Sequence, residues 1–278
     1  MSLLTAQGID FGKMMSTAIN PNSSVATVAA WPVVFSLASR ELVRFFRESK
    51  RVFGALGQPI IFWLLFSEGF APSGLEYTHF FPGVLVMILL FTAIFSTISI
   101  IEDRREGFLQ GVLVAPVPRW AMVLGKILGG TAIAMLQGLV FLLLGWLFVT
   151  GVSPSWSYLL LAIVFMSVVA LALTSLGFIL AWRMNSVQGY HAVMSCLLFP
   201  MWLLSGAFFP SGEGDWLSWI VAFNPLTYGV TGLRCYLTEP VAVAPTLTFS
   251  WVMMLLFALL TTGFACQIAR TRTTGDLL

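Results

Sequence analysis

Few residues in this 278-residue chain could do chemistry, and they form no known catalytic pattern. One candidate group is the charged run Glu102-Asp103-Arg104-Arg105-Glu106, whose mixed signs suit contact with a partner. The other comprises Glu213, Asp215 and Glu239 with His79, whose spacing matches no catalytic arrangement. The sequence has no H-E-x-x-H, G-x-S-x-G or G-x-x-x-x-G-K-S/T motif and no C-x-x-C pair. We therefore expect no catalytic, metal or cofactor site here, so any nucleotide energy must come from a partner.

The elements that position these residues must lie in a membrane. Hydrophobic residues make up 58% of the chain and charged residues only 9%, and the mean hydropathy is +0.92. A soluble domain has about 25% charged residues, so a water-soluble globule is excluded. Disorder is excluded too, because 24 Phe and 10 Trp residues require burial. The net charge of +2 is too small to indicate nucleic-acid binding.

Six stretches are long and apolar enough to cross a bilayer, which takes about 20 helical residues. We place them at Val52–Phe70, Phe80–Ile101, Ile127–Val149, Tyr158–Trp182, Gly189–Phe209 and Phe249–Ala269. The sequence thus predicts an all-α integral membrane protein with six transmembrane helices. Pro200 should kink the fifth of them, because proline removes a backbone hydrogen bond.

The distribution of Lys and Arg predicts how these spans are oriented. Of the 14 Lys and Arg residues, only Arg234 falls on one side of the predicted membrane. Because cationic loops favour the cytoplasmic face, both termini are expected in the cytoplasm. We expect a multi-pass protein of the plasma membrane, which in a bacterium is the inner membrane. No charged residue falls near a span centre, which argues against transport by a charged relay.

Residues 31–51 have the pattern of an amphipathic helix, with four arginines within about 60° of one another at 100° per residue. These arginines are Arg40, Arg44, Arg47 and Arg51. Phe35, Ala38, Leu42, Phe45 and Phe46 cluster on the opposite side, and Leu37 is out of place. The pattern predicts a helix in the inner headgroup region, with arginines toward lipid phosphate or cytosol and phenylalanines dipped inward. A mere topology signal is the alternative.

The inner loop 102–126 joins its charged run to a short apolar stretch, residues 107–114, which Pro116 and Pro118 end. A solvated loop has little reason to expose such side chains, so we expect a short helix that inserts them into a partner's groove. Folding back onto the bilayer is the alternative. The expected contact residues are Glu102, Arg105, Glu106, Gly107, Phe108, Leu109, Leu113, Val114 and Pro116. Gly125 and Gly129 form a G-x-x-x-G motif that allows close approach of another helix.

The outer segment 210–240 contains an apolar run, Trp216–Phe223, that is too short to span. Asn224-Pro225 breaks this run, which continues to Leu237. Trp216, Trp219 and Tyr228 suit the headgroup level. We expect a pair of short helices that dip into the outer leaflet or lie on it, and an ordinary loop is the alternative. The residues that define this segment are Gly206, Pro210, Trp216, Trp219, Asn224, Pro225, Tyr228 and Arg234.

These two segments carry a resemblance to a known family. Glu106-Gly107-Phe108-Leu109 with Pro116 is similar to the inner E-G-x-L-(x)n-P pattern of ABC-2-type exporter membrane subunits. Leu204–Pro210, then Asn224–Tyr228 and Arg234, resemble the ordered outer pattern of the same family. The resemblance covers residues 31–270.

The resemblance implies a permease that forms a dimer with a second copy of itself or a homologous permease. Two copies of a separate ATP-binding subunit would carry ATP and Mg²⁺, and this chain would bind no cofactor. The family's coupling helix maps onto 106–114, its interfacial helix onto 31–50 and its re-entrant helices onto 216–237. Charge reversal at Glu106, or Leu109→Asp, should then uncouple ATP hydrolysis from transport.

The expected organisation has four parts. Residues 1–30 form a disordered or peripheral segment, 31–51 the interfacial helix, 52–270 the six-span domain and 271–278 a cytoplasmic tail. Membrane lipid is an expected partner and nucleic acid is not. Family substrates include drugs, lipids and polysaccharide chains, and the many Phe, Trp and Met residues favour an amphiphilic one. An integral-membrane enzyme or assembly factor for lipid-linked material, or an ion-coupled carrier, are the alternatives.

Overall fold

The computed structural model describes residues 29–47, 49–70, 72, 77–149, 152, 154–207, 216–238 and 246–270. All regular secondary structure in these ranges is helical. The helices are α2 (Ala30–Arg47), α3 (Ser49–Phe70), α4 (Tyr77–Arg105), α5 (Phe108–Val114), α6 (Arg119–Phe148), α7 (Trp156–Arg183), α8 (Val187–Val193), α9 (Phe199–Trp202), α10 (Trp216–Phe223), α11 (Pro225–Leu237) and α12 (Leu247–Ile268). Two π-helical segments, η3 (Met194–Leu198) and η4 (Leu203–Ala207), flank α9. Of the segment expected at 1–30, residues 1–28 lie outside the described residues, as does the tail expected at 271–278.

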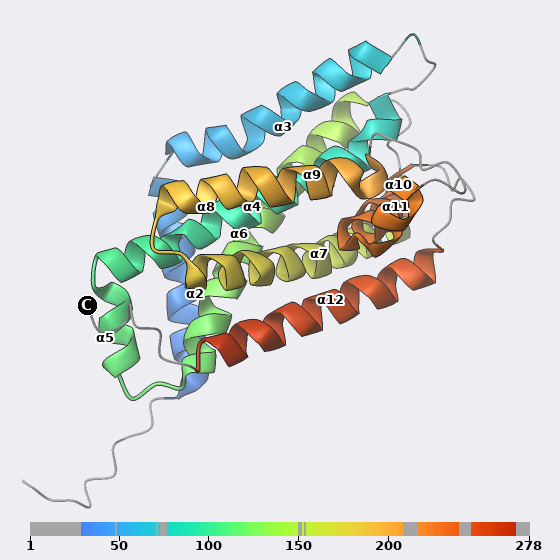
Figure 1. Ribbon diagram of the computed structural model, residues 1–278. Coiled ribbons are helices and arrows are strands. Elements are labelled where there is room, and N and C mark those ends of the chain that lie inside the picture. The colour runs from blue at the N-terminus through green and yellow to red at the C-terminus, as the bar shows by residue number, and fades with distance from the viewer. Residues whose placement is uncertain are drawn as a thin grey trace, which may run out of the picture.

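Five of the six predicted spans are confirmed as helices long and apolar enough to cross a membrane. They are α4, α6, α7, the run from α8 through η4, and α12. Within α3, the described apolar part, Pro59–Gly69, is shorter than a span, so the first span stays a prediction. The long helices run alongside one another, with α2 and α5 at one end and α10 and α11 at the other (Figure 1). We call these the α5 end and the α11 end.

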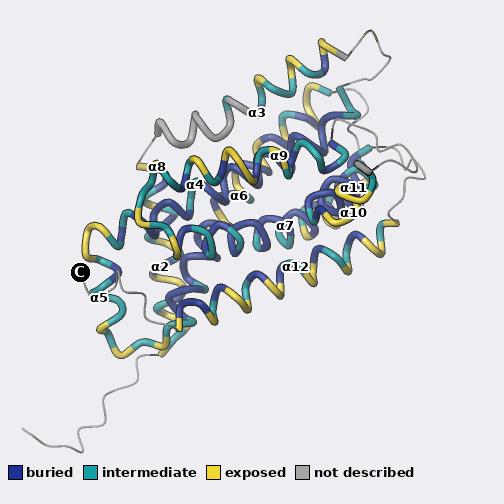
Figure 2. The backbone as a smooth tube through the Cα atoms, in the orientation of Figure 1, coloured by how far each residue is buried: buried dark blue, intermediate teal, exposed yellow. Residues whose placement is uncertain are grey.

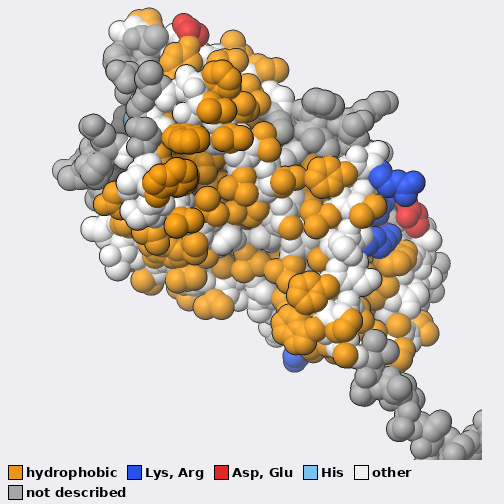
Figure 3. All heavy atoms as spheres, turned by 180° about the vertical axis from the view of Figure 1, so that it is seen from behind, with side chains coloured by type: hydrophobic (Ala, Val, Ile, Leu, Met, Phe, Trp, Pro, Cys, Tyr) orange, Lys and Arg blue, Asp and Glu red, His pale blue; other side chains and the backbone are white. Residues whose placement is uncertain are grey.

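Helix α4 forms the centre of the core. Its residues from Phe80 to Ile94 are all buried, because a helix that is apolar all round can be covered on every side. The outward sides of α3 and α12 remain exposed (Figure 2). Hydrophobic side chains cover the middle of the opposite face, and the few charged ones visible lie toward its margins (Figure 3). This arrangement suits a bundle whose solvent is lipid.

Helix α2 packs on α6 through the predicted G-x-x-x-G motif. A Cβ added at Gly125 would lie 2.8 Å from the Leu37 Cβ, and one at Gly129 would lie 2.8 Å from the Glu41 Cβ. The two backbones are therefore so close that only glycine fits at these two positions. The expected close approach is confirmed, and Leu37 belongs to the interface rather than being out of place.

The orientation predicted for α2 is wrong for two of its arginines, Arg40 and Arg44. Its buried residues are Val34, Leu37, Glu41 and Phe45. Phe35 and Phe46 are exposed, whereas Arg40 and Arg44 turn toward the bundle and bind carboxylates at the end of α4. The helical wheel alone assigned the arginines to lipid or cytosol, because it carries no information on the acidic partner. Arg47 is exposed as expected, and the Arg51 side chain lies outside the described set.

The pair of short helices predicted after the fifth span is confirmed, but only α10 is exposed as expected. Trp219 and Phe223 of α10 are largely exposed. Helix α11 is buried along most of its length between α7 and α12, and a Cβ at Gly232 would collide with the Phe165 ring. Tyr228, expected at headgroup level, is buried, and its hydroxyl donates to the Ala222 carbonyl at 2.6 Å.

Candidate coupling site

The α5 end begins where α4 stops and the chain turns sharply. Glu106 and Gly107 form this turn, which we call the elbow. Gly107 has φ of +77°, a left-handed conformation that side chains with a Cβ disfavour. Helix α5 follows and ends at Val114, before the prolines at 116 and 118. The expected short helix is therefore present, and glycine sets the angle at which it leaves α4.

A cluster of six charged side chains joins α2, α4 and α6 behind the elbow. We call it the ion network, and its members are Arg40, Glu41, Arg44, Glu102, Asp103 and Lys126. Arg40 donates two hydrogen bonds to the Asp103 carboxylate, at 3.0 and 2.8 Å. Arg44 donates to Asp103 and to Glu102, both at 2.9 Å. The network holds equal numbers of positive and negative charges.

Lys126 is the deepest cation of this network. It is 5% exposed and donates to Glu41, Asp103 and Ser99. Asp103 is fully buried and Glu41 is 4% exposed. Burial of such charges is tolerable only because each is paired and hydrogen-bonded, and loss of one member would leave a charge uncompensated. The network therefore fixes the register of α2 and α6 against α4.

Arg40 also connects the ion network to α5. Its guanidinium carbon lies 3.7 Å from the centre of the Phe108 ring, within the range of a cation–π contact. Hydrogen bonding to Asp103 raises the pKa of Arg40 above its usual value, against the opposing effect of burial. The cation over Phe108 is thus held by the same carboxylate that anchors α4 and α6.

The residues expected to enter a partner do not share one exposed face. Val114 is 86% exposed, and Glu106, Gly107 and Pro116 are exposed too. Leu109 is 3% exposed and faces its own chain, while Phe108 and Leu113 pack against the core. Glu102 and Arg105 lie within α4, where Glu102 binds Arg44 and Arg105 donates to the Asn185 carbonyl. Leu109→Asp would therefore test burial rather than docking.

Two further arginines cap the ends of neighbouring helices. Arg104 donates to the Trp182 carbonyl at 2.8 Å and the Met184 carbonyl at 3.2 Å, beside the end of α7. Arg119 donates to the Ala269 carbonyl at 3.0 Å, just after α12. Cations suit these positions because the last carbonyls of a helix lack partners and carry partial negative charge.

Sequence reasoning missed Asp103, Lys126 and Glu41 as parts of one cluster. The available signals were an acid inside the arginine-rich helix and a lysine at the edge of an apolar span. Either residue requires a counter-charge if it is buried. Among the described residues, no group of His, Cys, Asp and Glu is placed to hold a metal ion.

The motif residues of the α11 end meet around a kink. Gly206 has φ of +74°, and its carbonyl accepts from Arg234 at 3.3 Å. Asn224 caps α11 by accepting from the Leu226 amide at 3.0 Å, and Pro225 occupies the first turn. Pro210 lies outside the described residues, as do Glu213, Asp215 and Glu239, and only the backbone of Trp216 is described.

Pro200 lies between the two π-helical segments, but the backbone departs from helical φ/ψ at Gly206 rather than at Pro200. Trp202 secures this stretch to α4, because its indole nitrogen donates to the Gly83 carbonyl at 2.8 Å. A Cβ at Gly83 would lie 2.5 Å from the Ala207 Cβ, so the two helices touch there. The kinked stretch is thereby fixed against α4 by apolar packing and a neutral hydrogen bond.

Comparison with known proteins agrees with this architecture. The chain is 27% identical over 223 residues to a protein named transport permease ycf38 of Cyanophora paradoxa, covering 77% of both chains. It is 24% identical to the inner membrane transport permease YadH of Escherichia coli (strain K12), covering 73% of this chain and 82% of that protein. It is also 24% identical to DrrC of Mycobacterium tuberculosis (strain CDC 1551 / Oshkosh), named a doxorubicin resistance ABC transporter permease protein, covering 70% and 73%.

Residues 32–238 match the family described as ABC-2 type transporter, and this range contains both the ion network and the kinked α11 end. The predicted resemblance is confirmed. This multi-pass membrane protein belongs to the ABC-2 type transporter family.

Proposed function

We propose that this chain is the membrane subunit of an ATP-driven exporter, worked by separate ATP-binding subunits that dock at the α5 end. Its family and its relatives named as permeases support this role. The observation that carries the proposal is the attachment of α5. Arg40 lies over its Phe108 ring and binds Asp103, which also binds Lys126. Rotation of a docked subunit would therefore move α2, α4 and α6 together.

The proposal includes orientation and assembly. The α5 end faces the cytosol, since the charged segments around it carry nearly all Lys and Arg residues. The first span completes six, and the membrane is the inner membrane of a bacterium. Two such chains, or this chain with a homologous permease, line the pathway, and two ATP-binding subunits hold ATP and Mg²⁺. The substrate is amphiphilic, such as a drug, a lipid or a lipid-linked polysaccharide.

Val114→Asp in the purified permease–ATPase complex tests the docking role of α5. Val114 is 86% exposed, so the substitution leaves the fold intact and adds a charge to the docking helix. We expect permease-dependent stimulation of ATP hydrolysis to fall about tenfold or more, since an unpaired charge in an interface is costly. Val114→Thr, which keeps the shape, should behave like the wild type. Full stimulation in Val114→Asp would exclude this surface.

Two further measurements test the division of labour. The purified chain alone should hydrolyse no ATP, and hydrolysis without a partner would contradict the proposal. In a variant without its native cysteines, Val114→Cys in intact cells should react with a membrane-permeant maleimide but not with an impermeant one. Labelling by the impermeant reagent would place α5 outside the cell and end the proposal.

A further inference from the structure

Arg234 is bonded unlike the arginines of the α5 end. It belongs to α11 and is half-buried beside the start of α4 and the left-handed glycine of η4. Its Nη2 donates to two backbone carbonyls, those of His79 at 3.5 Å and Gly206 at 3.3 Å, and both distances are long for such bonds. It forms no ion pair in the described part of the chain. The Arg234 charge therefore has only weak, neutral partners there.

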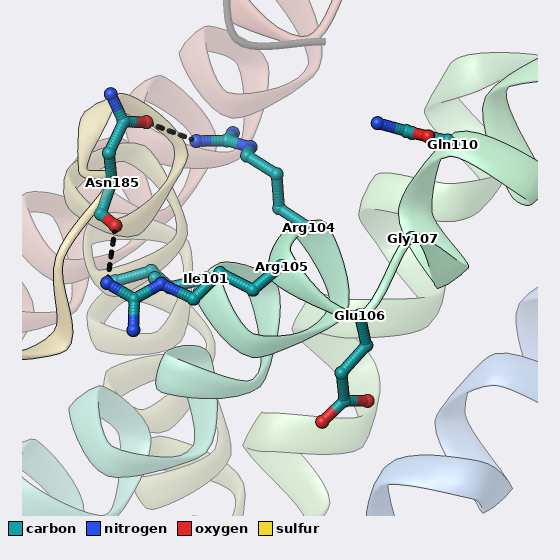
Figure 4. Close-up of a pocket in the computed structure, with 7 residues that line it drawn as sticks. All are labelled: Ile101, Arg104, Arg105, Glu106, Gly107, Gln110 and Asn185. Carbon is teal, nitrogen blue, oxygen red and sulfur yellow. Dashed lines mark hydrogen bonds between the residues drawn. The ribbon is translucent and has the colours of Figure 1, made fainter. Parts of the chain in front are cut away.

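The arginines of the α5 end show what a structural arginine does. In the pocket beside the elbow, Arg105 donates to the Asn185 carbonyl at 2.9 Å and Arg104 to the Asn185 side chain at 3.3 Å (Figure 4). Arg104 also donates to the Trp182 carbonyl at 2.8 Å. Each of them has a short bond that joins α4 to the end of α7 or to the segment that follows it. Arg234 has no such short bond among the described residues, so joining segments does not account for it.

The guanidinium of Arg234 has donors that no described group uses. Nε is buried without a hydrogen-bond partner. Nη1 makes no hydrogen bond in the described part of the chain and is not among the buried atoms, so it remains accessible. Desolvation of a cation is costly unless a counter-charge compensates it. An anion that reached Nη1 and Nη2 would supply that counter-charge.

A phosphate or a carboxylate fits these donors. The terminal nitrogens of a guanidinium lie in one plane and match two oxygens of either group. Charge-assisted hydrogen bonds are about twice as strong as neutral ones. The exchange of two long carbonyl bonds for bonds to an anion is therefore favourable.

The surroundings of Arg234 favour an anion that carries an apolar tail. Helix α10 contacts both η4, which contains Gly206, and α11, which contains Arg234. Trp219 and Phe223 of α10 are 69% and 82% exposed, and α10 lies beside α11 in Figure 1. An apolar tail would be stabilised along this surface, whereas a free phosphate would gain nothing from it.

We propose that Arg234 binds the phosphate or carboxylate head group of an anionic amphiphile at the α11 end. The inference rests on the proposed function, which places this end at the outer face of the membrane in an exporter. It narrows the expected amphiphilic substrate to one with a negative charge. A phospholipid of the outer leaflet presents the same head group, and the measurements below distinguish these two sources.

Arg234→Gln and Arg234→Met test the site in the purified chain, held in phosphatidylcholine nanodiscs. Both remove the charge, and the glutamine variant keeps an amide that can donate to carbonyls, which protects the fold. The probe is decyl phosphate, with decyl maltoside as its uncharged counterpart, and affinity is measured by isothermal titration calorimetry. We expect the wild type to bind the phosphate in preference to the maltoside. Both variants should bind the phosphate about tenfold more weakly, the size expected for a lost hydrogen bond to a charged group.

Arg183→Gln is the matched control. Arg183 is an exposed arginine in the last turn of α7, at the α5 end. Its loss changes the net charge equally but leaves the α11 end untouched, so the affinity for decyl phosphate should equal that of the wild type. An equal loss in Arg183→Gln would mean that net charge alone decides. That result, wild-type affinity in either Arg234 variant, or no preference for the phosphate in the wild type would overturn the inference.

Two further measurements identify the source of the head group. If decyl phosphate stimulates ATP hydrolysis by the wild-type permease–ATPase complex but not by the Arg234→Gln complex, the site takes the exported substrate. If phosphatidylglycerol instead co-purifies with the wild type and not with Arg234→Gln, as lipid mass spectrometry would show, the site holds a resident lipid and the narrowing of the substrate is wrong. If the wild-type chain brings down no ATP-binding subunit, the proposed function fails, while binding of decyl phosphate by the chain alone still decides the site.

Discussion

The two ends of the bundle are held together by different forces. At the α5 end, paired charges join α2, α4 and α6, and arginines cap the ends of α7 and α12. At the α11 end, Arg234 donates only to the carbonyls of His79 and Gly206, at 3.5 and 3.3 Å, and no carboxylate pairs with it in the described part of the chain. Apolar packing, neutral hydrogen bonds and a bond from the Tyr77 hydroxyl to Glu68 are the other described contacts there.

This difference indicates that the two ends of the bundle are constrained by different kinds of contact. Paired buried charges have strict geometric requirements, so we expect the ion network to hold α2, α4 and α6 in one register. The α8–η4 stretch contains π-helical segments, a proline and a left-handed glycine, which mark places where helical hydrogen bonding is irregular. The α8–η4 stretch is thus an irregular helix held by packing, whereas the α5 end is held by paired charges.

Lys126→Met should have the largest effect on stability. It leaves the buried Glu41 with only its longer contact to Arg40, at 3.3 Å, and removes one partner of Asp103. Removing one member of a buried ion pair costs about 3–5 kcal/mol. We expect that loss in the free energy of unfolding, measured by titration with sodium dodecyl sulfate in mixed micelles.

The double variant Lys126→Met with Glu41→Gln is the control for this experiment. It removes both charges, so it should recover a large part of the loss. A single variant as stable as the wild type would show that the ion network does not hold the α5 end.

Five of the spans and the short helix α5 could be predicted from local sequence. Runs such as residues 158–182 are too apolar for anything but a bilayer, and the prolines at 116 and 118 confine α5 to one short helix. Asn224-Pro225 likewise fixed the break between α10 and α11. These features depend on residues adjacent in the sequence, so periodicity and propensity suffice.

The contacts between distant segments could not be predicted in the same way. Arg40 and Asp103 are 63 positions apart, and the sequence around either residue does not identify the other as its partner. Lys126 was assigned to the edge of a loop because hydropathy excludes charge, whereas α6 begins at Arg119 and buries it. Tyr228 was assigned to the headgroups by its type, and its buried hydroxyl bond is a tertiary feature.

Gly129→Leu tests whether close packing contributes as much as charge at the α5 end. A Cβ there would lie 2.8 Å from the Glu41 Cβ and 3.1 Å from the Ala38 carbonyl oxygen, so α2 must move away. Overpacking costs about 1–3 kcal/mol, measured in the same unfolding titration. Gly263→Leu in α12 has no neighbour within 4 Å and should not destabilise the protein. Equal loss in both variants would point to glycine itself rather than to the interface.

Gly107→Ala and Gly206→Ala introduce the same backbone strain at the α5 end and at the α11 end, so their effects can be compared. Both glycines have positive φ, and neither has an atom within 4 Å of an added Cβ. Each substitution should cost about 1–2 kcal/mol for the left-handed backbone. Only Gly107→Ala re-aims α5, so it alone should reduce stimulation of the ATP-binding subunit. Reduced stimulation in Gly206→Ala instead would mean that the kink, not the elbow, sets coupling.

Arg234→Met should have the smallest effect on the free energy of unfolding. It tests directly whether a charge stabilises the α11 end as charges do the α5 end. Burial lowers the pKa of Arg234, and no carboxylate in the described part of the chain pairs with it. The variant loses two long hydrogen bonds to carbonyls but also removes the desolvation cost. These opposing contributions should leave the free energy of unfolding within about 1 kcal/mol of the wild type. A loss as large as that of Lys126→Met would show that the α11 end, too, depends on charge.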